Sequence, residues 1–161
     1  MHASLTIRLA TRNDVQQLLA LYPHLNPEDA IPSLAVAEQR LADLEKYDGS
    51  GVFVGTLNGV IVVSCTLIVI PNLTRGGQPY ALIENVVTCA DMRGRGFGKE
   101  ILKAAVEAAW RSDCYKAMLM TGSKLPSTLQ FYASAGFEQN KTGFQVRRIP
   151  VREEQADRTE G

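Results

Sequence analysis

The sequence predicts a single α/β (α+β) domain, built on a mixed, mostly antiparallel sheet with helices on both faces. Two patterns carry this prediction. Strand-like and helix-like segments follow one another in the order βααβββαβαβ, which combines consecutive strands with strand–helix–strand crossovers. In addition, Asn58-Gly59 joins two β-rich runs and is a strong hairpin signal, so the strands on either side of it are expected to be antiparallel.

The first half of the chain predicts a strand, two helices and this hairpin. Thr11 with Asp14 resembles a capping box at the start of the helix that follows the first strand. Apolar residues at helical spacing between Leu34 and Leu44 indicate a second helix, which ends before the Asp48-Gly49 turn. The strands of this half are expected at residues 5–9, 51–57 and 60–70.

The second half alternates strands with helices after a flexible loop. An amphipathic helix has its apolar face between Phe97 and Ala108 and ends near Arg111, and a short helix over 127–134 follows Pro126. Strands are expected at residues 80–89, 115–120 and 144–149. Residues 1–150 are expected to form one domain, and residues 151–161, six of which are charged, a disordered tail.

Composition narrows the functional classes. Lys+Arg and Asp+Glu both number 17, so no overall field would draw the chain to nucleic acid or to a membrane surface. No apolar run reaches the roughly 20 residues of a membrane helix, and the N-terminal segment lacks the features of a secretory signal, which favours the cytoplasm. The cysteines lack CxxC spacing and are expected to be reduced core thiols; with only two histidines, no metal site is expected.

The stretch RGRGFGKE, residues 93–100, suggests an anion site. It fails the nucleotide P-loop pattern, because Arg93 stands where the first glycine should be and Glu100 follows Lys99 where serine or threonine is required. It also fails the dinucleotide fingerprint, and an arginine-glycine nucleic-acid segment would be longer and disordered. Small residues nevertheless let successive N–H groups approach an anion at the positive end of a helix, so a diphosphate would fit. The alternative is a glycine-rich turn with incidental basic residues.

The pattern Arg93-x-x-Gly96-x-Gly98 between a strand and a helix, with FYASAGF at residues 131–137, resembles the GNAT family of N-acetyltransferases. The order of elements is similar to that family's over nearly all of residues 5–149. The stretches IENVV, RGRGFGK, CYK and FYASAGF are most similar to its glucosamine-6-phosphate N-acetyltransferase branch, although Asn85 stands where that branch usually has an aspartate. The resemblance implies the GNAT fold, acetyl-CoA as co-substrate and no metal.

The resemblance also implies a cofactor site. Backbone N–H groups from about Arg95 to Lys99 would cradle the pyrophosphate of acetyl-CoA, with nearby cations adding to the attraction. The pantetheine arm would run along the preceding strand, whose backbone groups can pair with its amides and stabilise the oxyanion. The predicted cofactor-binding residues are Val86, Val87, Arg93, Gly94, Arg95, Gly96, Phe97, Gly98 and Lys99.

Glu84 is the predicted general base. On ideal alternation Leu82, Glu84 and Val86 share one face of the strand, and Ile83, Asn85 and Val87 share the other, so a carboxylate lies between apolar neighbours. Burial raises the pKa of a carboxylate toward neutrality and makes it a better proton acceptor, acting directly or through a water. The alternatives are a partner for a buried basic group and an exposed edge residue.

Tyr132 is the predicted general acid. The resembling family commonly has a tyrosine in the short helix after the fifth full strand, where it can donate a proton to the departing thiolate. The alternative is a core tyrosine with a satisfied hydroxyl. Many relatives carry an asparagine seven residues earlier, where this sequence has Leu125, so Ser123 or Ser127 would have to replace that cofactor contact.

The leading function is acetyl-CoA-dependent N-acetylation of a small-molecule amine, of the amino sugar, amino acid or polyamine class, by direct attack in a ternary complex. A protein or peptide N-acetyltransferase and a non-catalytic acyl-CoA-binding regulatory module are the alternatives. A homodimer is expected, because pairing of the final strands across a two-fold axis is common in the resembling branch. The acceptor-pocket candidates are Tyr22, His24, Arg75 and Lys124.

Overall fold

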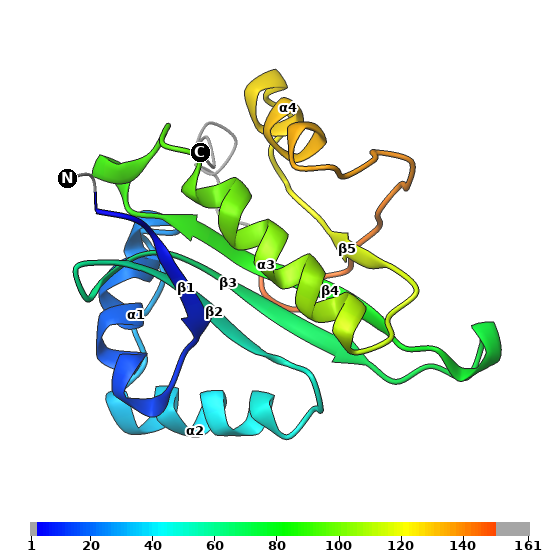
Figure 1. The fold of residues 1–161 in the computed structure, drawn as a ribbon, viewed down its shortest axis with the longest axis horizontal. Helices are drawn as coiled ribbons and strands as arrows, with labels where there is room; N and C mark the ends of the chain where they lie inside the picture. The colour runs from blue at the N-terminus through cyan, green and yellow to red at the C-terminus, as the bar shows by residue number, and fades with distance from the viewer. Residues whose placement is uncertain (1–2, 151–161) are drawn as a thin grey trace.

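The computed structural model describes residues 3–150 and contains one five-stranded sheet with the strand order β1-β2-β3-β4-β5 (Figure 1). Neighbouring strands from β1 to β4 are antiparallel, and β4 and β5 are parallel. The strands are β1 (Thr6–Leu9), β2 (Gly51–Leu57), β3 (Val60–Ile70), β4 (Tyr80–Thr88) and β5 (Ala117–Leu119). The helices are α1 (Val15–Leu21), α2 (Leu34–Glu45), α3 (Phe97–Arg111) and α4 (Pro126–Ser134).

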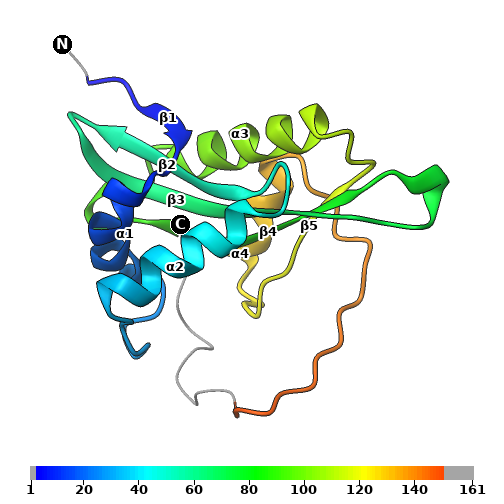
Figure 2. The ribbon, with the colours of Figure 1, turned by 90° about the horizontal axis from the view of Figure 1, so that it is seen from below.

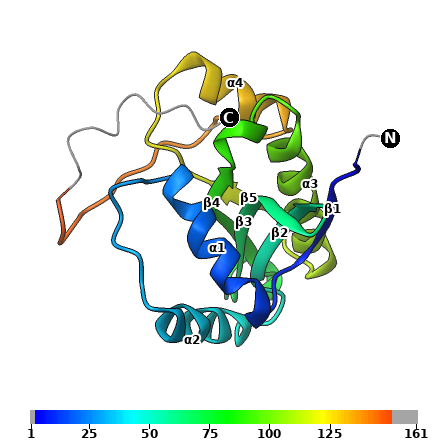
Figure 3. The same ribbon diagram turned by 90° about the vertical axis from the view of Figure 1, so that its left-hand side faces the viewer.

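The helices form layers on both faces of the sheet, as predicted. Figure 2 shows α3 on one side of the strands and α1 with α2 on the other, and Figure 3 shows the same layers from the end of the sheet. Each layer has its own core: Ile101, Leu102 and Ala105 of α3 are fully buried against one face, and Leu18 and Leu21 of α1 are buried against the other. The expected mixed sheet is therefore confirmed.

The hairpin between β2 and β3 forms at the predicted position. Asn58 and Gly59 both have positive φ, 50° and 79°, which is the backbone that a type I′ turn requires and that Asn-Gly adopts at low cost. Leu57 and Val60 pair directly across the turn. The turn thus sets the register of β2 and β3 next to it, and a shift between Gly55 and Thr56 changes the register farther along the two strands.

Asp14 links β1 to the start of α1. Its carboxylate accepts hydrogen bonds from the Arg8 guanidinium at 2.6 and 2.9 Å and from the N–H of Thr11 at 2.7 Å, although only 5% of the residue is exposed. The hydrogen bonds from Arg8 are the main reason that the pKa of Asp14 falls from 3.8 to about 2, while burial acts in the opposite direction. The predicted capping box is present, with this ion pair added to it.

Asp14→Asn is expected to lower the free energy of unfolding by about 2 kcal/mol near neutral pH, since each unit of pKa difference corresponds to about 1.4 kcal/mol. The folded protein lowers the pKa of Asp14 below its ordinary value of 3.8. The stabilisation is therefore fully present at pH values above 3.8 and is lost as the pH falls toward about 2. Urea unfolding at several pH values measures the difference between the two proteins. Asp43→Asn, which removes two solvent-exposed ion pairs, should have a much smaller effect. An Asp14→Asn deficit that persists undiminished in acid would contradict this assignment.

The predicted last strand, residues 144–149, is wrong for the isolated chain. Residues 138–150 contain no helix or strand and are exposed throughout, and Figure 2 shows them running apart from the body of the protein. Phe144 and Val146 are 94% and 99% exposed. A strand needs a neighbouring strand to satisfy its backbone groups, and this segment pairs with none among residues 3–150. The tail predicted for residues 151–161 lies outside the described residues.

The three cysteines are free thiols, as predicted, and Cys65 and Cys114 are buried. Burial raises the pKa of Cys65 to about 12. Between residues 3 and 150 there is no helix both long enough and apolar enough to cross a membrane, and no cluster of three or more side chains suited to hold a metal ion.

Candidate active site

The sheet opens between β4 and β5. The two parallel strands pair only at Ala81, Leu82 and Ile83 of β4, opposite residues 117–119 of β5. Beyond β5 the chain turns away toward α4 (Figure 1), so within the described residues the stretch 84–88 of β4 has no strand partner on that side. An extended ligand with amide groups can pair with such an edge as an added strand would.

A β-bulge lies at the start of this open edge. Asn85 has a φ of 53°, in the left-handed region that asparagine tolerates better than most residues, and the β3–β4 register shifts at this point. Glu84 pairs with Thr66 and Val87 with Ser64, so Asn85 and Val86 both lie opposite Cys65. The bulge therefore releases part of the backbone of β4 from the regular ladder.

The bulge corrects the prediction that strict alternation holds along β4. Ile83 and Val86 both contact the core beneath α3, whereas Val87 belongs to the core beneath α1 and α2. Ile83 and Val87 were expected to share a face, and so were Glu84 and Val86. The inserted residue reverses the alternation after Glu84, because each extra residue moves the following side chains to the opposite face.

Glu84 occupies the position where pairing with β5 has ended and the bulge begins. Its side chain is half-buried. This lies between the buried carboxylate and the exposed edge residue that the sequence allowed. Glu84 is therefore the first residue of the open edge of β4. Its role as a base stays a prediction.

The predicted anion loop joins β4 to α3. Gly94 and Gly96 have φ values of 76° and 83°, and there is open space where a side chain would be. Gly96 is the N-cap of α3, and no side chain caps the first turn. The N–H groups of Phe97, Gly98 and Lys99 thus lie at the positive end of a 15-residue helix, which is the arrangement that binds phosphate in many proteins.

Gly98 serves a different purpose from the other two glycines. It is buried, and a Cβ atom there would lie 2.8 Å from Cζ of Phe131 in α4. The absence of a side chain thus allows α4 to rest on the first turn of α3. Tyr132 follows Phe131, is 7% exposed, and has its ring in edge contact with those of Phe131 and Phe137 at 5.0 and 6.4 Å. The loop and the predicted acid are therefore neighbours.

The basic residues of the loop do not all behave alike. Arg95 and Lys99 are exposed. Arg93 is exposed as well, but its Nη2 donates a hydrogen bond to the backbone carbonyl of His24, at 2.8 Å. His24 is one of the acceptor-pocket candidates, and the structure places it against this loop.

The other acceptor-pocket candidates have different surroundings. Arg75 lies in the β3–β4 connection, before the start of β4, and its guanidinium stacks over the ring of Tyr115 at 5.2 Å. Tyr22 is half-buried in the core beneath α1 and α2, where burial is the main cause of its raised pKa. Lys124 is exposed in the β5–α4 connection. The glycine loop lies at the opposite end of β4 from Arg75.

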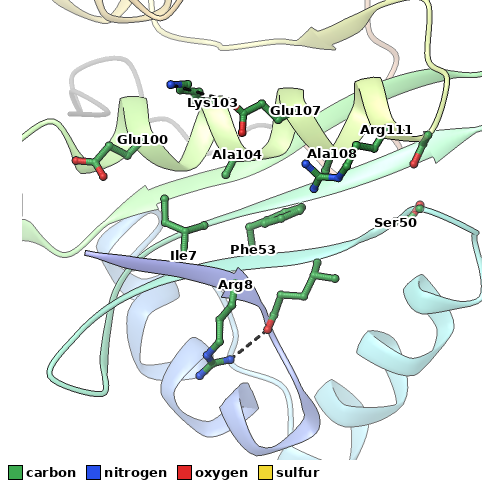
Figure 4. Close-up of a pocket in the computed structure, with 13 residues that line it drawn as sticks. Ile7, Arg8, Ser50, Phe53, Glu100, Lys103, Ala104, Glu107, Ala108 and Arg111 are labelled. Atoms are coloured by element: carbon green, nitrogen blue, oxygen red, sulfur yellow. Dashed lines mark hydrogen bonds and ion pairs between the residues drawn. The ribbon is translucent and has the colours of Figure 1, made fainter. Parts of the chain in front are cut away.

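A separate groove of about 810 Å³ lies between α3 and the edge strand β1 (Figure 4). Ile7, Phe53, Ala104 and Ala108 form an apolar strip between the two elements, and the α3 side carries both cations and anions, including the Lys103–Glu107 pair at 4.0 Å. None of the predicted catalytic or cofactor-binding residues lines this groove. The candidate active site is the open edge of β4 with the loop that follows it.

Comparison with known proteins shows which family the chain resembles throughout the described fold. A model of the acetyltransferase (GNAT) family matches residues 13–137. The glucosamine 6-phosphate N-acetyltransferase of Trypanosoma brucei brucei is 32% identical over 139 residues, which cover 85% of this chain and 91% of that protein. A solved structure from Agrobacterium tumefaciens, thought to be an acetyltransferase, is 45% identical with a TM-score of 0.83 and covers 89% of this chain and 99% of its own. The glucosamine-6-phosphate N-acetyltransferase of Arabidopsis thaliana has the same fold, with a TM-score of 0.80 at 17% identity over 91% of this chain and 99% of its own.

Proposed function

This chain belongs to the GNAT family of acetyltransferases, and from that premise we propose that it transfers the acetyl group of acetyl-CoA to the primary amine of a small molecule. One observation carries the proposal: the open edge of β4 leads directly, through Gly94 and Gly96, into the uncapped first turn of α3. An extended amide arm followed by a diphosphate would find a strand edge and then a helix N-terminus, in that order.

We propose amino sugars as the first acceptor class to test, with amino acids and polyamines after them. The relative from Trypanosoma brucei brucei, which is matched over most of both chains, is a glucosamine 6-phosphate N-acetyltransferase and supports this order. The reaction would be direct attack of the amine on the thioester carbonyl in a ternary complex. The amine nitrogen forms the new bond to the acetyl carbon, and the bond from that carbon to sulfur breaks.

The residues of this chain would divide the work as follows. Backbone N–H groups from Arg95 to Lys99 would bind the diphosphate, and Val86 with Val87 would flank the pantetheine arm. Glu84 would accept the proton of the attacking ammonium, directly or through a water. A backbone N–H released by the bulge would stabilise the oxyanion, and Tyr132 would donate a hydrogen bond or proton to the departing sulfur. Bound acetyl-CoA supplies the activated acetyl group.

A spectrophotometric screen for thiol release tests the proposal. Purified protein with acetyl-CoA is offered amino sugars, amino acids, polyamines and short peptides, and acceptor-dependent release of CoA by a small amine is the expected result. Saturation by peptide amines alone would instead favour a protein N-acetyltransferase. Tight binding of CoA without transfer to any amine would favour a non-catalytic acyl-CoA-binding module.

We further infer a homodimer, formed by pairing of the exposed C-terminal segment with a second copy. Phe144 and Val146 alternate as in a strand and are almost fully exposed, and the described residues leave the outer edge of β5 without a strand partner. Light scattering should give twice the mass of one chain. Val146→Asp should shift the protein toward the monomer, whereas Arg147→Ala on the neighbouring position should not. A wild-type protein that is monomeric at micromolar concentration would end this inference.

A further inference from the structure

Two segments far apart in the sequence meet at the end of β4. One is the single turn Tyr22–His24 that follows α1, and the other is the turn Ala90–Met92 that follows β4, together with Arg93. The N–H of Ala90 donates to Nδ1 of His24 at 3.1 Å, and Nη2 of Arg93 donates to the His24 carbonyl at 2.8 Å. Both acceptor atoms therefore belong to His24, and both donors belong to the segment that leads into the glycine loop.

His24 is held in a firm position for this contact. Pro23 restricts the backbone of the turn, and the N–H groups of Leu25 and Asn26 both bond to the carbonyl of Tyr22, at 2.9 and 3.1 Å. Residues 25–33, which connect this turn to α2, contain no helix or strand. The hydrogen bonds to His24 thus hold the N-terminal end of the connection 25–33 in place.

The turn that carries the two donors, Ala90 and Arg93, is also held by backbone hydrogen bonds. The N–H of Cys89 bonds to the carbonyl of Val62 at 2.8 Å, and the N–H of Met92 bonds to the carbonyl of Cys89 at 2.8 Å, so the turn is anchored to β3. Arg93 comes directly before Gly94, whose φ of 76° begins the anion loop. The contact with His24 therefore restrains the loop at its first residue.

We propose that His24 and Arg93 are positioning residues, which form a latch between the cofactor loop and the connection between α1 and α2. On this proposal, which rests on the proposed function, ordering of residues 94–99 by the cofactor restrains residues 25–33 through the latch. By reciprocity, a ligand that orders residues 25–33 strengthens cofactor binding. Arg93 then acts through His24 rather than as a direct ligand of the diphosphate.

The chemistry of the histidine supplies a matched pair of variants. Nδ1 accepts a hydrogen bond only when the ring is neutral with its proton on Nε2. In His24→Asn the side-chain oxygen can replace Nδ1 as acceptor, whereas His24→Leu has a comparable volume and no acceptor. Arg93→Ala removes the second bond from the opposite side and serves as an independent variant if His24→Leu fails to fold.

Hydrogen–deuterium exchange with and without CoA, on the full chain, tests the latch without knowledge of the acceptor. In the wild type, CoA should slow exchange in residues 94–99 and also in residues 22–33. In His24→Leu and in Arg93→Ala the protection of residues 94–99 should persist and that of residues 22–33 should be reduced, because each variant removes one of the two bonds. Calorimetry should show CoA bound about 2- to 10-fold more weakly. His24→Asn should restore the protection of residues 22–33 and the affinity for CoA.

The outcomes separate the two proposals. If CoA fails to bind the wild-type protein, both the proposed function and the latch are overturned. If CoA binds and slows exchange in residues 94–99 but residues 22–33 are unaffected, or are protected equally in His24→Leu, only the latch is overturned.

Discussion

Glu84→Gln is expected to lower acceptor-dependent release of CoA by about 10²–10⁴-fold, the usual contribution of a positioned general base. Glutamine has nearly the same shape but cannot take up the proton of the attacking ammonium. Because the side chain lies beside the bulge rather than in the glycine loop, the affinity for CoA should change little. The rate is followed by thiol release with the best acceptor from the screen, and the affinity by calorimetry.

Glu107→Gln is the matched control for this experiment. Glu107 is an exposed glutamate of α3 that lines the separate groove facing β1, and its side chain is 54% accessible. Its replacement should leave both rate and affinity near the wild-type values. A Glu84→Gln enzyme that retains half of the wild-type rate over a range of pH would remove Glu84 from the mechanism.

Gly96→Val is expected to weaken binding of acetyl-CoA by about tenfold or more. Gly96 has a φ of 83°, and a residue with a Cβ pays roughly 1–2 kcal/mol to adopt this conformation. The loop would relax away from it in the free protein, and the cofactor would have to restore it on binding. Calorimetry with acetyl-CoA gives the affinity, and circular dichroism establishes that the fold is retained.

The chain contains its own control for backbone strain. Gly76, in the β3–β4 connection, has a φ of 68° and open space around it, as Gly96 has. Gly76→Val should therefore strain the chain to a similar degree at a distance from the loop. Equal loss of affinity in both variants would show that the glycine loop has no special role in cofactor binding.

Local patterns allowed most of the fold to be predicted. The boundaries of β2, β3 and the end of α3 agree with the prediction, because the Asn58-Gly59 turn and the apolar spacing of α3 depend on neighbouring residues alone. The last strand was mispredicted for the opposite reason. The alternation of Phe144 and Val146 is typical of a strand, but whether a strand forms depends on a partner edge that a pattern cannot supply.

In the candidate site, too, the features set by local sequence could be predicted and those set by distant residues could not. The glycine loop could be predicted, because positive φ is a property of Gly94 and Gly96 themselves. The bulge could not, since an alternating pattern assumes no inserted residue, and Asn85 was the only local hint of it. The contact between Arg93 and His24 could not be predicted either, because 69 positions separate the two residues and nothing in either segment indicates the other.

Close contact between Gly98 and Phe131 makes two pieces of the enzyme one mechanical body. The helix that carries Tyr132 rests on the first turn of α3 through this contact. On the proposed function, a ring packed on bare backbone would therefore set the distance between the groups that bind the diphosphate and the group that faces the sulfur. A methyl group added at Gly98 would push α4 away from the first turn of α3. A smaller side chain in place of Phe131 would loosen the contact between the two helices. On the proposed function, the spacing of the reacting groups would thus be set by a hydrophobic contact that touches neither reactant.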